Sequence, residues 1–225
     1  MIFSGLEFMG KVPFENVLIH GTILTKEGKR MSKSLGTGID PLKYIDEYGA
    51  DATRFAVIWQ ANGQDIKWDE AAVIAGRKFA NKIWNAARFV LQQSGISNFS
   101  AKGGSALGRQ FPISKPKPRT AADKKILKEL AETKKKIEKG LEKFEFSKAL
   151  HELYDFFWHD FCDVYLEKSK SQITNHKLQK NTKGVLLCVL TESLKMLHPF
   201  MPFITEEVWS YLPQREKQLL LITKW

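Results

Sequence analysis

The sequence predicts a mainly α-helical protein, in which a short α/β segment at residues 1–68 is followed by an antiparallel helical bundle at residues 69–225. Short apolar runs that glycine and proline interrupt occupy the first segment, and such runs are typical of strands and turns. From Asp69 onward, large apolar residues recur at helical spacing in long stretches, as expected for helices that each bury one face.

The first segment is expected to contain few strands. Val17–Gly21 has the pattern of a short buried strand that glycine closes, and Thr22–Thr25 is expected to continue it. Pro13 indicates that Phe8–Phe14 forms a turn and an edge strand, because proline lacks the amide that a central strand needs. One or two strands leave open edges and an apolar face, so we expect this segment to require the rest of a sheet.

Two helices are expected after these strands. Asp40 can accept hydrogen bonds from free amides, and Pro41 has a φ angle suited to the first helical position, so a helix is predicted to begin there and to end at Gly49. Asp51 is predicted to cap a second helix that runs through Trp59.

The bundle is predicted from apolar stripes. Glycine and proline punctuate residues 93–120, which we expect to form a connection without regular structure. Lysines at 124–143 alternate with glutamates, a pattern that favours a solvated helix face over a phosphate-binding stripe. The expected helices cover residues 69–91, 124–144, 146–168 and 185–197, with a last one that Thr205 caps.

Charge and cysteine content narrow the class of protein. A net charge of +10 and a pI near 9.5 indicate a polyanionic partner, either nucleic acid or an anionic membrane. No apolar run approaches the roughly 18 residues of a membrane span and no signal peptide pattern is visible, so neither a membrane protein nor a secreted one is expected. Cys162 and Cys188 are far apart, which indicates buried thiols in the cytoplasm. His151 and His159 lack metal-ligand spacing, and no metal site is predicted.

The residues that point to chemistry form a loop at 30–36. Arg30 and Lys33 supply two cations, while Ser32 and Ser34 supply hydroxyl donors that a polyphosphate can accept. Gly36 allows the backbone a close approach. A lysine- and serine-rich turn that only keeps a loop solvated is the alternative interpretation. The expected position between a strand and a helix N-terminus favours phosphate binding, because ligands bind there in open α/β folds.

This loop is similar to a known signature. Arg30–Ser34, RMSKS, resembles the KMSKS motif of class I aminoacyl-tRNA synthetases, with arginine in the first place and Thr37 where asparagine is more usual. Other stretches resemble the members of the family that are specific for valine. These stretches are GQDI at 63–66, FANKIWNAARF at 79–89, FCDVYLE at 161–167 and HPFMPFITEEVW at 198–209.

The resemblance implies an activity and a domain organisation. Members of the family that are specific for valine use ATP, with Mg²⁺, to form valyl-adenylate and then transfer the valyl group to tRNA. By analogy, residues 1–68 are the C-terminal remnant of a Rossmann-like catalytic domain, with the loop and a region that contacts the tRNA stem, and residues 69–225 bind the anticodon. The analogy gives Lys33 and Arg30 a catalytic role, and it assigns ATP binding to His20, Gly21, Met31, Ser32, Lys33 and Ser34.

The resemblance also implies what a complete enzyme needs beyond this sequence. The family carries a first catalytic half with an HIGH motif, an editing domain and, in the valine type, a coiled-coil arm. We therefore expect this chain to be the C-terminal part of a longer ligase and to be inactive alone, with the N-terminal catalytic half supplied in cis or in trans. The alternative is a tRNA-binding module without catalysis, or one half of a split synthetase.

Overall fold

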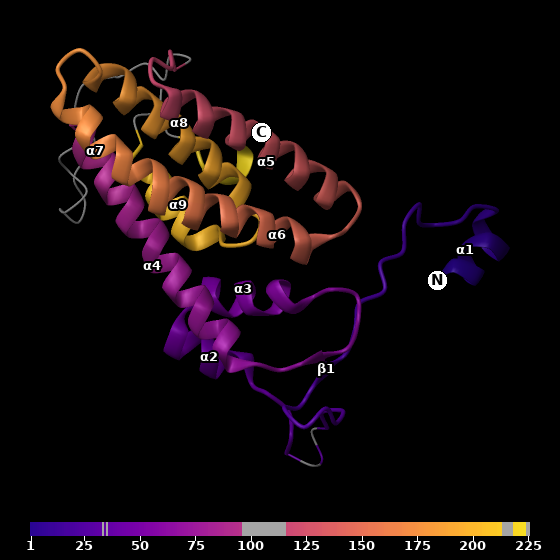
Figure 1. Cartoon of the computed structure of the whole chain (residues 1–225). Helices are drawn as coiled ribbons and strands as arrows, with labels where there is room; N and C mark the ends of the chain where they lie inside the picture. The colour runs from indigo at the N-terminus through magenta and orange to yellow at the C-terminus, as the bar shows by residue number, and fades with distance from the viewer. Residues whose placement is uncertain (33, 35, 96–115, 213–217, 224–225) are drawn as a thin grey trace.

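The structure is a computed structural model, and it describes residues 1–225 except 33, 35, 96–115, 213–217 and 224–225. Most of the described residues lie in helices, as the sequence predicted, and few lie in strands. Figure 1 shows the long helices gathered on one side of the molecule, with the hairpin and loop of the first segment at the opposite tip.

The described residues of the first segment form three helices and one pair of short strands. The strands pair in parallel, with Ile23 opposite Ile66 and Leu24 opposite Lys67. The elements are α1 (Ile2–Met9), β1 (Ile23–Leu24), α2 (Pro41–Tyr48), α3 (Ala50–Gln60) and β2 (Ile66–Lys67).

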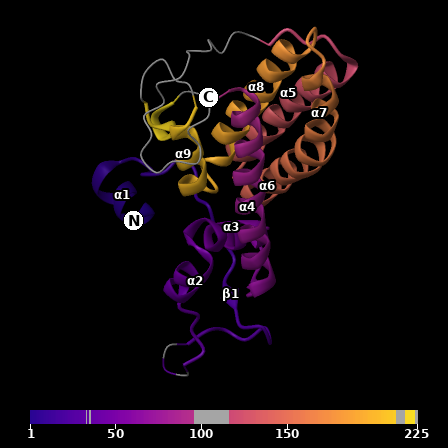
Figure 2. The same ribbon diagram turned by 90° about the vertical axis from the view of Figure 1, so that its left-hand side faces the viewer.

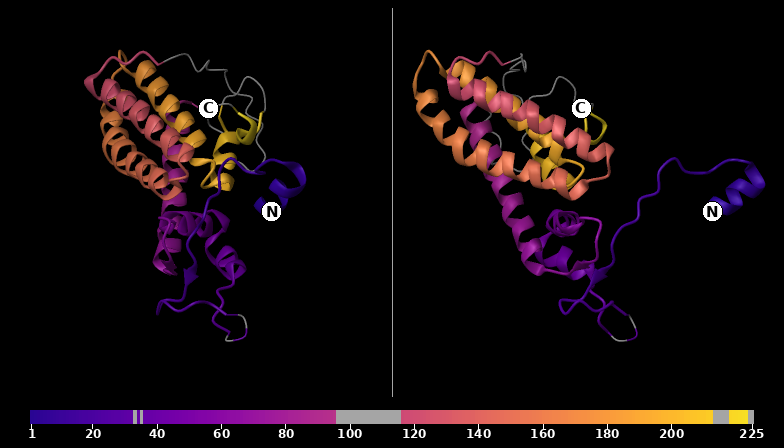
Figure 3. Two further views of the ribbon diagram at one scale, coloured as in Figure 1. Left: turned by 90° about the vertical axis from the view of Figure 1, so that its right-hand side faces the viewer. Right: turned by 45° about the vertical axis from the view of Figure 1, so that its right-hand side comes forward.

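The prediction of a buried strand at Val17–Gly21 is wrong. Val17, Leu18 and Ile19 are 62%, 55% and 83% exposed, and β1 begins only at Ile23. Among the described residues, β2 is the one strand that pairs with β1, so nothing supplies a hydrogen-bonding edge for residues 17–21. The turn and edge strand expected at Phe8–Phe14 is also absent from the described structure, where α1 extends to Met9 and lies apart from the other helices (Figures 1 and 3).

The described residues of the second part of the chain form helices and the short connections between them. The predicted connection at 93–120 lies mostly outside the described residues. Figures 1 and 2 show α5, the run from α6 to α7, and α8 lying side by side, while α4 continues from them toward α2 and α3. The elements are α4 (Glu70–Gln93), α5 (Ala121–Glu142), α6 (Phe146–Asp155), η2 (Phe156–Leu166), α7 (Glu167–Thr174), α8 (Gln179–Leu197), α9 (Pro202–Ser210) and η3 (Leu220–Ile222).

One of the three predicted helix caps is present in the structure. Asp40 caps α2 as predicted, accepting from the Leu42 amide at 3.0 Å with Pro41 next in the chain. Asp51 does not cap its own helix, because its carboxylate accepts hydrogen bonds from amides in the first turn of α9. Thr205 does not cap α9 either, because the helix already starts at Pro202 and the Thr205 hydroxyl lies inside it.

Two hydrophobic clusters hold these elements together. The larger one joins residues of α3 to α9 and also reaches η3. The smaller one lies beneath the β1–β2 pair and consists of Ala52, Ala56, Trp68, Ala72 and Val73, with Ile23, Met31, Ile39, Tyr44 and Tyr48 packed against it. Because α3 contributes to both clusters, it connects the first segment to the helical part.

The two helices that meet between the clusters, α3 and α4, cross closely at Gly76. A Cβ atom at this position would lie 2.8 Å from the Ala52 carbonyl oxygen and 3.0 Å from the Phe55 Cβ atom. Both atoms belong to the backbone or to the first side-chain carbon of α3, so a small rotamer change would not make room. The crossing therefore depends on glycine.

We expect Gly76→Ala to destabilise the fold, because the added methyl group forces the two helices apart at a cost of about 1–3 kcal/mol. Alanine also favours a helix over glycine by about 1 kcal/mol, so the net loss should be up to about 2 kcal/mol. Gly184→Ala in α8 is the matched control, because no atom lies within 4 Å of a Cβ there, and it should stabilise the protein. Urea unfolding measures the free energy of unfolding of both variants. A change of the same sign in both would contradict this account of the crossing.

Candidate functional site

A short hairpin presents the loop that sequence analysis singled out. The Thr25 amide donates to the Lys29 carbonyl at 2.8 Å, and the Gly28 amide donates to the Thr25 carbonyl at 2.9 Å. Gly28 has φ +80°, a conformation that other residues adopt only with strain. The hairpin places Arg30 opposite Leu24 of β1, so the loop begins directly beside the strand pair.

Thr37 closes the loop from its far end. Its hydroxyl accepts from the Ser32 amide at 3.0 Å, and its own amide donates to the Ser32 carbonyl at 3.2 Å. Within the loop, the Ser32 and Ser34 hydroxyl groups lie 2.8 Å apart. Met31 and Ile39, which flank this closure, both pack against the smaller hydrophobic cluster. The two ends of the loop are thus anchored, although Lys33 itself lies outside the described residues.

The described cations of the loop and hairpin face solvent. Arg30 and Lys29 are exposed, and no side-chain hydrogen bond or ion pair joins either of them to another described residue. Lys26 forms only a long ion pair, with 3.9 Å between its Nζ atom and Glu70 Oε2. Because exposed ion pairs contribute little to stability, these cations are available for an anionic ligand.

His20 and Gly21, which were assigned to ATP binding, lie at the start of β1. Gly21 passes so close to Gln64 that a Cβ atom would overlap the Gln64 carbonyl group. Next to it, the Thr22 amide donates to Asp65 Oδ1 at 2.7 Å, and the Ile66 amide donates to the Thr22 carbonyl at 2.9 Å. Gly21 therefore has a structural reason to be glycine, and contact of His20 or Gly21 with ATP stays a prediction.

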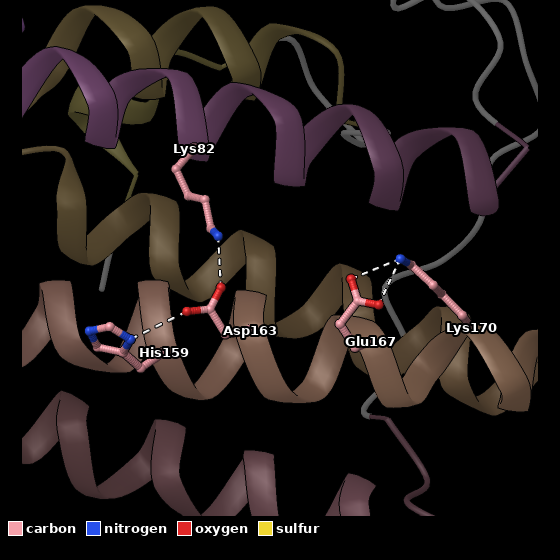
Figure 4. Close-up of polar contacts among 5 residues, drawn as sticks. All are labelled: Lys82, His159, Asp163, Glu167 and Lys170. Atoms are coloured by element: carbon pink, nitrogen blue, oxygen red, sulfur yellow. Dashed lines mark hydrogen bonds and ion pairs between the residues drawn. The ribbon is translucent and has the colours of Figure 1, made fainter.

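Sequence analysis did not anticipate a second group of side chains, which joins α4 to η2 and to Tyr154 near the end of α6; Figure 4 shows three of its members, Lys82, His159 and Asp163. We name it the α4–η2 cluster: Lys82, Tyr154, Trp158, His159 and Asp163. Lys82 Nζ donates to Asp163 Oδ1 at 2.7 Å, and the other carboxylate oxygen lies 3.3 Å from His159 Nδ1. Lys82 Nζ also lies 4.8 Å from the centre of the Trp158 ring. The cluster therefore places the Lys82 cation against an aromatic face.

The cluster remains accessible to a ligand. The Lys82 and His159 side chains are 30% and 59% exposed. The hydrogen bond from Lys82 holds the pKa of Asp163 below its usual range, so the carboxylate stays ionised at neutral pH. Tyr154 stacks on Trp158 with 5.3 Å between ring centres, which keeps the indole ring in place. Further along the same helical run, Glu167 and Lys170 form a separate pair at 2.8 Å (Figure 4).

No sequence signal could have revealed this cluster. Lys82 and Asp163 are 81 residues apart, and each looks like an ordinary charged residue on a helix. His159 and Asp163 are four residues apart, but the described residues include no group of three or more histidines, cysteines or acids that could hold a metal ion. None of the described helices is long and apolar enough to span a membrane.

We expect Gly21→Ala to disrupt the contact between residues 20–22 and 64–66, because the methyl group can be accommodated only if the backbone moves. Amide hydrogen exchange at Ile66 should accelerate about 10-fold or more as local opening becomes easier. Gly38→Ala is the control, since a Cβ there has no atom within 4 Å. Unchanged exchange at Ile66 in the Gly21 variant would show that this close approach does not support the strand pair.

Two family sequence models match the chain. One describes class I tRNA synthetases for isoleucine, leucine, methionine and valine and matches residues 1–69. The other describes the anticodon-binding domain of tRNA ligases and matches residues 123–225. The candidate loop lies within the first match, and the η2 residues of the α4–η2 cluster lie within the second.

Curated relatives match over the full chain. Valine–tRNA ligases from Clostridium tetani and Geobacillus kaustophilus are 45% and 43% identical to it over 228 residues, and both alignments include all of this chain. The chain spans 24% of the length of these relatives.

Solved structures share the fold. The LeuRS–tRNA–LeuAMS complex of Agrobacterium radiobacter K84 matches 96% of this chain and 24% of its own, with a TM-score of 0.72 and 23% identity. Methionyl-tRNA synthetase from Mycobacterium tuberculosis, in complex with methionyl-adenylate, matches 85% of this chain and 37% of its own, with a TM-score of 0.65 and 18% identity. The chain is therefore similar to class I aminoacyl-tRNA synthetases over both family matches, and to valine–tRNA ligases over its whole length.

Proposed function

We propose that this chain is part of an ATP-dependent valine–tRNA ligase, which forms valyl-adenylate and transfers the valyl group to tRNA. In this proposal, residues 1–68 are the end of a Rossmann-like catalytic domain and carry the KMSKS-like loop and a region that contacts the tRNA stem. Residues 69–225 form an antiparallel bundle that binds the anticodon. The observation that carries the proposal is the match of the whole of this chain to part of valine–tRNA ligases, at 41–45% identity.

The loop is proposed to bind the phosphates of ATP. Lys33 would follow the negative charge that grows on the pyrophosphate leaving group, and Arg30 would assist it. Ser32, Ser34 and the neighbouring Met31 would complete the loop's contacts with ATP, and His20 and Gly21 are proposed to contact ATP as well. The exposed cations and the closure by Thr37 support this assignment, because a preorganised set of donors stabilises a transition state without further reorganisation.

ATP is expected to enter as its Mg²⁺ complex, with the ion held mainly by phosphate oxygens. No group of acidic residues among those described suggests a protein-held metal ion beside the loop. The loop therefore acts through its own cations and hydroxyl groups, and the chemistry needs no general acid or base from it.

We expect Lys33→Ala in the ligase that contains this chain to slow valyl-adenylate formation about 100- to 1000-fold, the usual cost of removing one preorganised charge donor. The KM for valine should change much less, because the lost contact is made mainly in the transition state. Valine-dependent ATP–pyrophosphate exchange measures both quantities. Lys135→Ala, an exposed residue of α5, is the control and should behave like the parent; equal rates for Lys33→Ala and the parent would refute the assignment.

The α4–η2 cluster is proposed to contact tRNA. Lys82 offers a cation to phosphate, and Trp158 and His159 offer ring faces and polar edges to unpaired bases. Its exposure supports this proposal, and so does the net charge of the chain, +10.

We expect Lys82→Met to weaken tRNA binding about 3- to 30-fold and to lower the slope of log Kd against log salt by about one, as the loss of one phosphate contact requires. Methionine keeps the length of the side chain and removes its charge. Lys128→Met on α5 is the control, since Lys128 is exposed and lies outside the cluster. Fluorescence anisotropy with a valine tRNA at several salt concentrations decides the matter, and the same change in both variants would rule out a specific contact at Lys82.

The exposed apolar residues of segment 1–19 support the need for a further part of the catalytic domain. They include Phe3, Phe8, Val17 and Ile19, each more than half exposed. An apolar surface of this kind is typical of an interface, and we propose that the N-terminal catalytic half covers it, in cis or in trans. If no such half exists, the chain is instead a tRNA-binding module without catalysis. In either case we expect a cytoplasmic protein, because both cysteines are free and burial raises the pKa of Cys162 to about 12.

A further inference from the structure

Helix α3 is attached to the helical part of the chain at both ends and in the middle. Near its C-terminal end, Trp59 contacts α6. The Trp59 carbonyl accepts from the Ser147 hydroxyl at 2.7 Å, and the Trp59 ring stacks on His151 with 3.5 Å between ring centres. Its middle crosses α4 at Gly76. Its N-terminal turn contacts α9 through Asp51. Attachment at three places leaves α3 little freedom to rotate.

The contact at Asp51 is polar and nearly buried. The carboxylate is 7% exposed and accepts from the Phe203 amide at 3.2 Å and from the Ile204 amide at 2.6 Å. These amides belong to the first turn of α9, where a helix has no internal acceptors for them. Burial raises the pKa of Asp51, and the two amide hydrogen bonds oppose that rise.

Arg54, one turn further along α3, binds the chain that leads into α9. Its Nη2 atom donates to the Pro199 carbonyl at 3.0 Å, and its Nε atom donates to the Phe200 carbonyl at 3.4 Å. Asp51 and Arg54 together therefore take up both the free amides and the free carbonyls of residues 199–204. This turn is 145 or more residues away in the sequence, so the pair joins two distant parts of the chain.

The opposite side of α3 carries the loop-bearing segment. Ala52 and Ala56 form part of the smaller hydrophobic cluster, against which Met31, Ile39 and Tyr44 pack. Met31 and Ile39 are the residues that flank the closed loop, and Gly49 is the single residue between α2 and α3 in the chain. The direction of the loop relative to the helical part thus follows the orientation of α3, together with the start of α4, which contributes Ala72 and Val73 to the same cluster.

We propose that Asp51 is a positioning residue for transfer of the valyl group to tRNA. By fixing the N-terminal end of α3 on α9, it holds the ATP-binding loop and the tRNA-binding helices in the one relative orientation that lets a single tRNA use both. This inference rests on the function proposed above. Formation of the adenylate does not need the helical part, whereas transfer to tRNA needs both parts aligned, so the two steps depend on Asp51 to different extents.

The test compares two buried aspartates in the ligase that contains this chain. Asp51→Asn keeps the size of the side chain but leaves one oxygen to accept from two amides. Asp123→Asn is the matched control, because Asp123 is fully buried and accepts from the Tyr165 hydroxyl at 2.8 Å at the start of α5, away from α3. Asp51→Glu tests rescue by a longer carboxylate.

We expect Asp51→Asn to lower the kcat of tRNA valylation about 10- to 100-fold, the scale of a misalignment of about 1 Å. Valine-dependent ATP–pyrophosphate exchange without tRNA and the Kd for tRNA should both stay within about 3-fold of the parent. Asp123→Asn should reduce the rates of tRNA valylation and of ATP–pyrophosphate exchange by the same factor, in proportion to any loss of folded protein. Asp51→Glu should recover part of the valylation rate.

Two results would overturn the inference. The first is valylation of tRNA by Asp51→Asn at the parent rate. The second is a fall in the valylation rate that equals the fall in the rate of ATP–pyrophosphate exchange. A parent protein that forms no valyl-adenylate would instead refute the proposed function, and with it the inference. Amide hydrogen exchange separates these cases, because Asp51→Asn should accelerate exchange at Phe203 and Ile204 about 10-fold whether or not the protein is an enzyme. Unchanged exchange there would show that the carboxylate does not hold α9.

Discussion

The rest of the structure depends on the close crossing of α3 and α4 at Gly76. Because the backbones approach there without an intervening side chain, Phe55 can reach the larger hydrophobic cluster while Ala52 and Ala56 join the smaller one. A helix that is buried on both sides transmits position rather than flexing. The loop, the strand pair and α2 reach the helical part through α3 and through the start of α4, whose Ala72 and Val73 belong to the smaller cluster.

The candidate functional elements lie at two ends of this arrangement. The loop that begins at Arg30 stands at the tip of the first segment, and the α4–η2 cluster lies among the long helices, with α4 leading from one toward the other (Figures 1 and 2). The loop and hairpin present exposed cations and the cluster presents the partly exposed Lys82, and a basic protein of this kind attracts a polyanion over a distance. A single extended polyanion such as tRNA could contact both, whereas a small phosphate ligand could occupy only the loop.

Local signals in the sequence predicted much of the fold. Helix periodicity identified the long helices, and the Asp40–Pro41 pair gave the start of α2 correctly, because a cap acts within four residues. Signals that depend on distant partners failed. Asp51 was expected to cap its own helix, but it lies inside α3 and its oxygens accept from amides of α9. Val17–Gly21 has a strand pattern without a described neighbour that could pair with it.

For the candidate site, too, the sequence predicted features that are local in the chain and missed those that depend on the folded backbone or on distant partners. Residue types and spacing identified the RMSKS loop, because all of its members are adjacent in the chain. The closure of the loop by Thr37 could not be foreseen, since it depends on a backbone path that the residue types do not specify. The pairing of Lys82 with Asp163 depends on how α4 packs against η2, and only the folded structure brings them together.

The most direct test of the central claim is to purify, from its own cell, the protein or complex that contains this chain and to assay ATP–pyrophosphate exchange with each amino acid. Our account predicts exchange that depends on valine, together with binding of valine tRNA by the same preparation. A preparation that binds tRNA but catalyses no exchange with any amino acid would contradict it, and the chain would then be a tRNA-binding module whose cationic loop has no catalytic use.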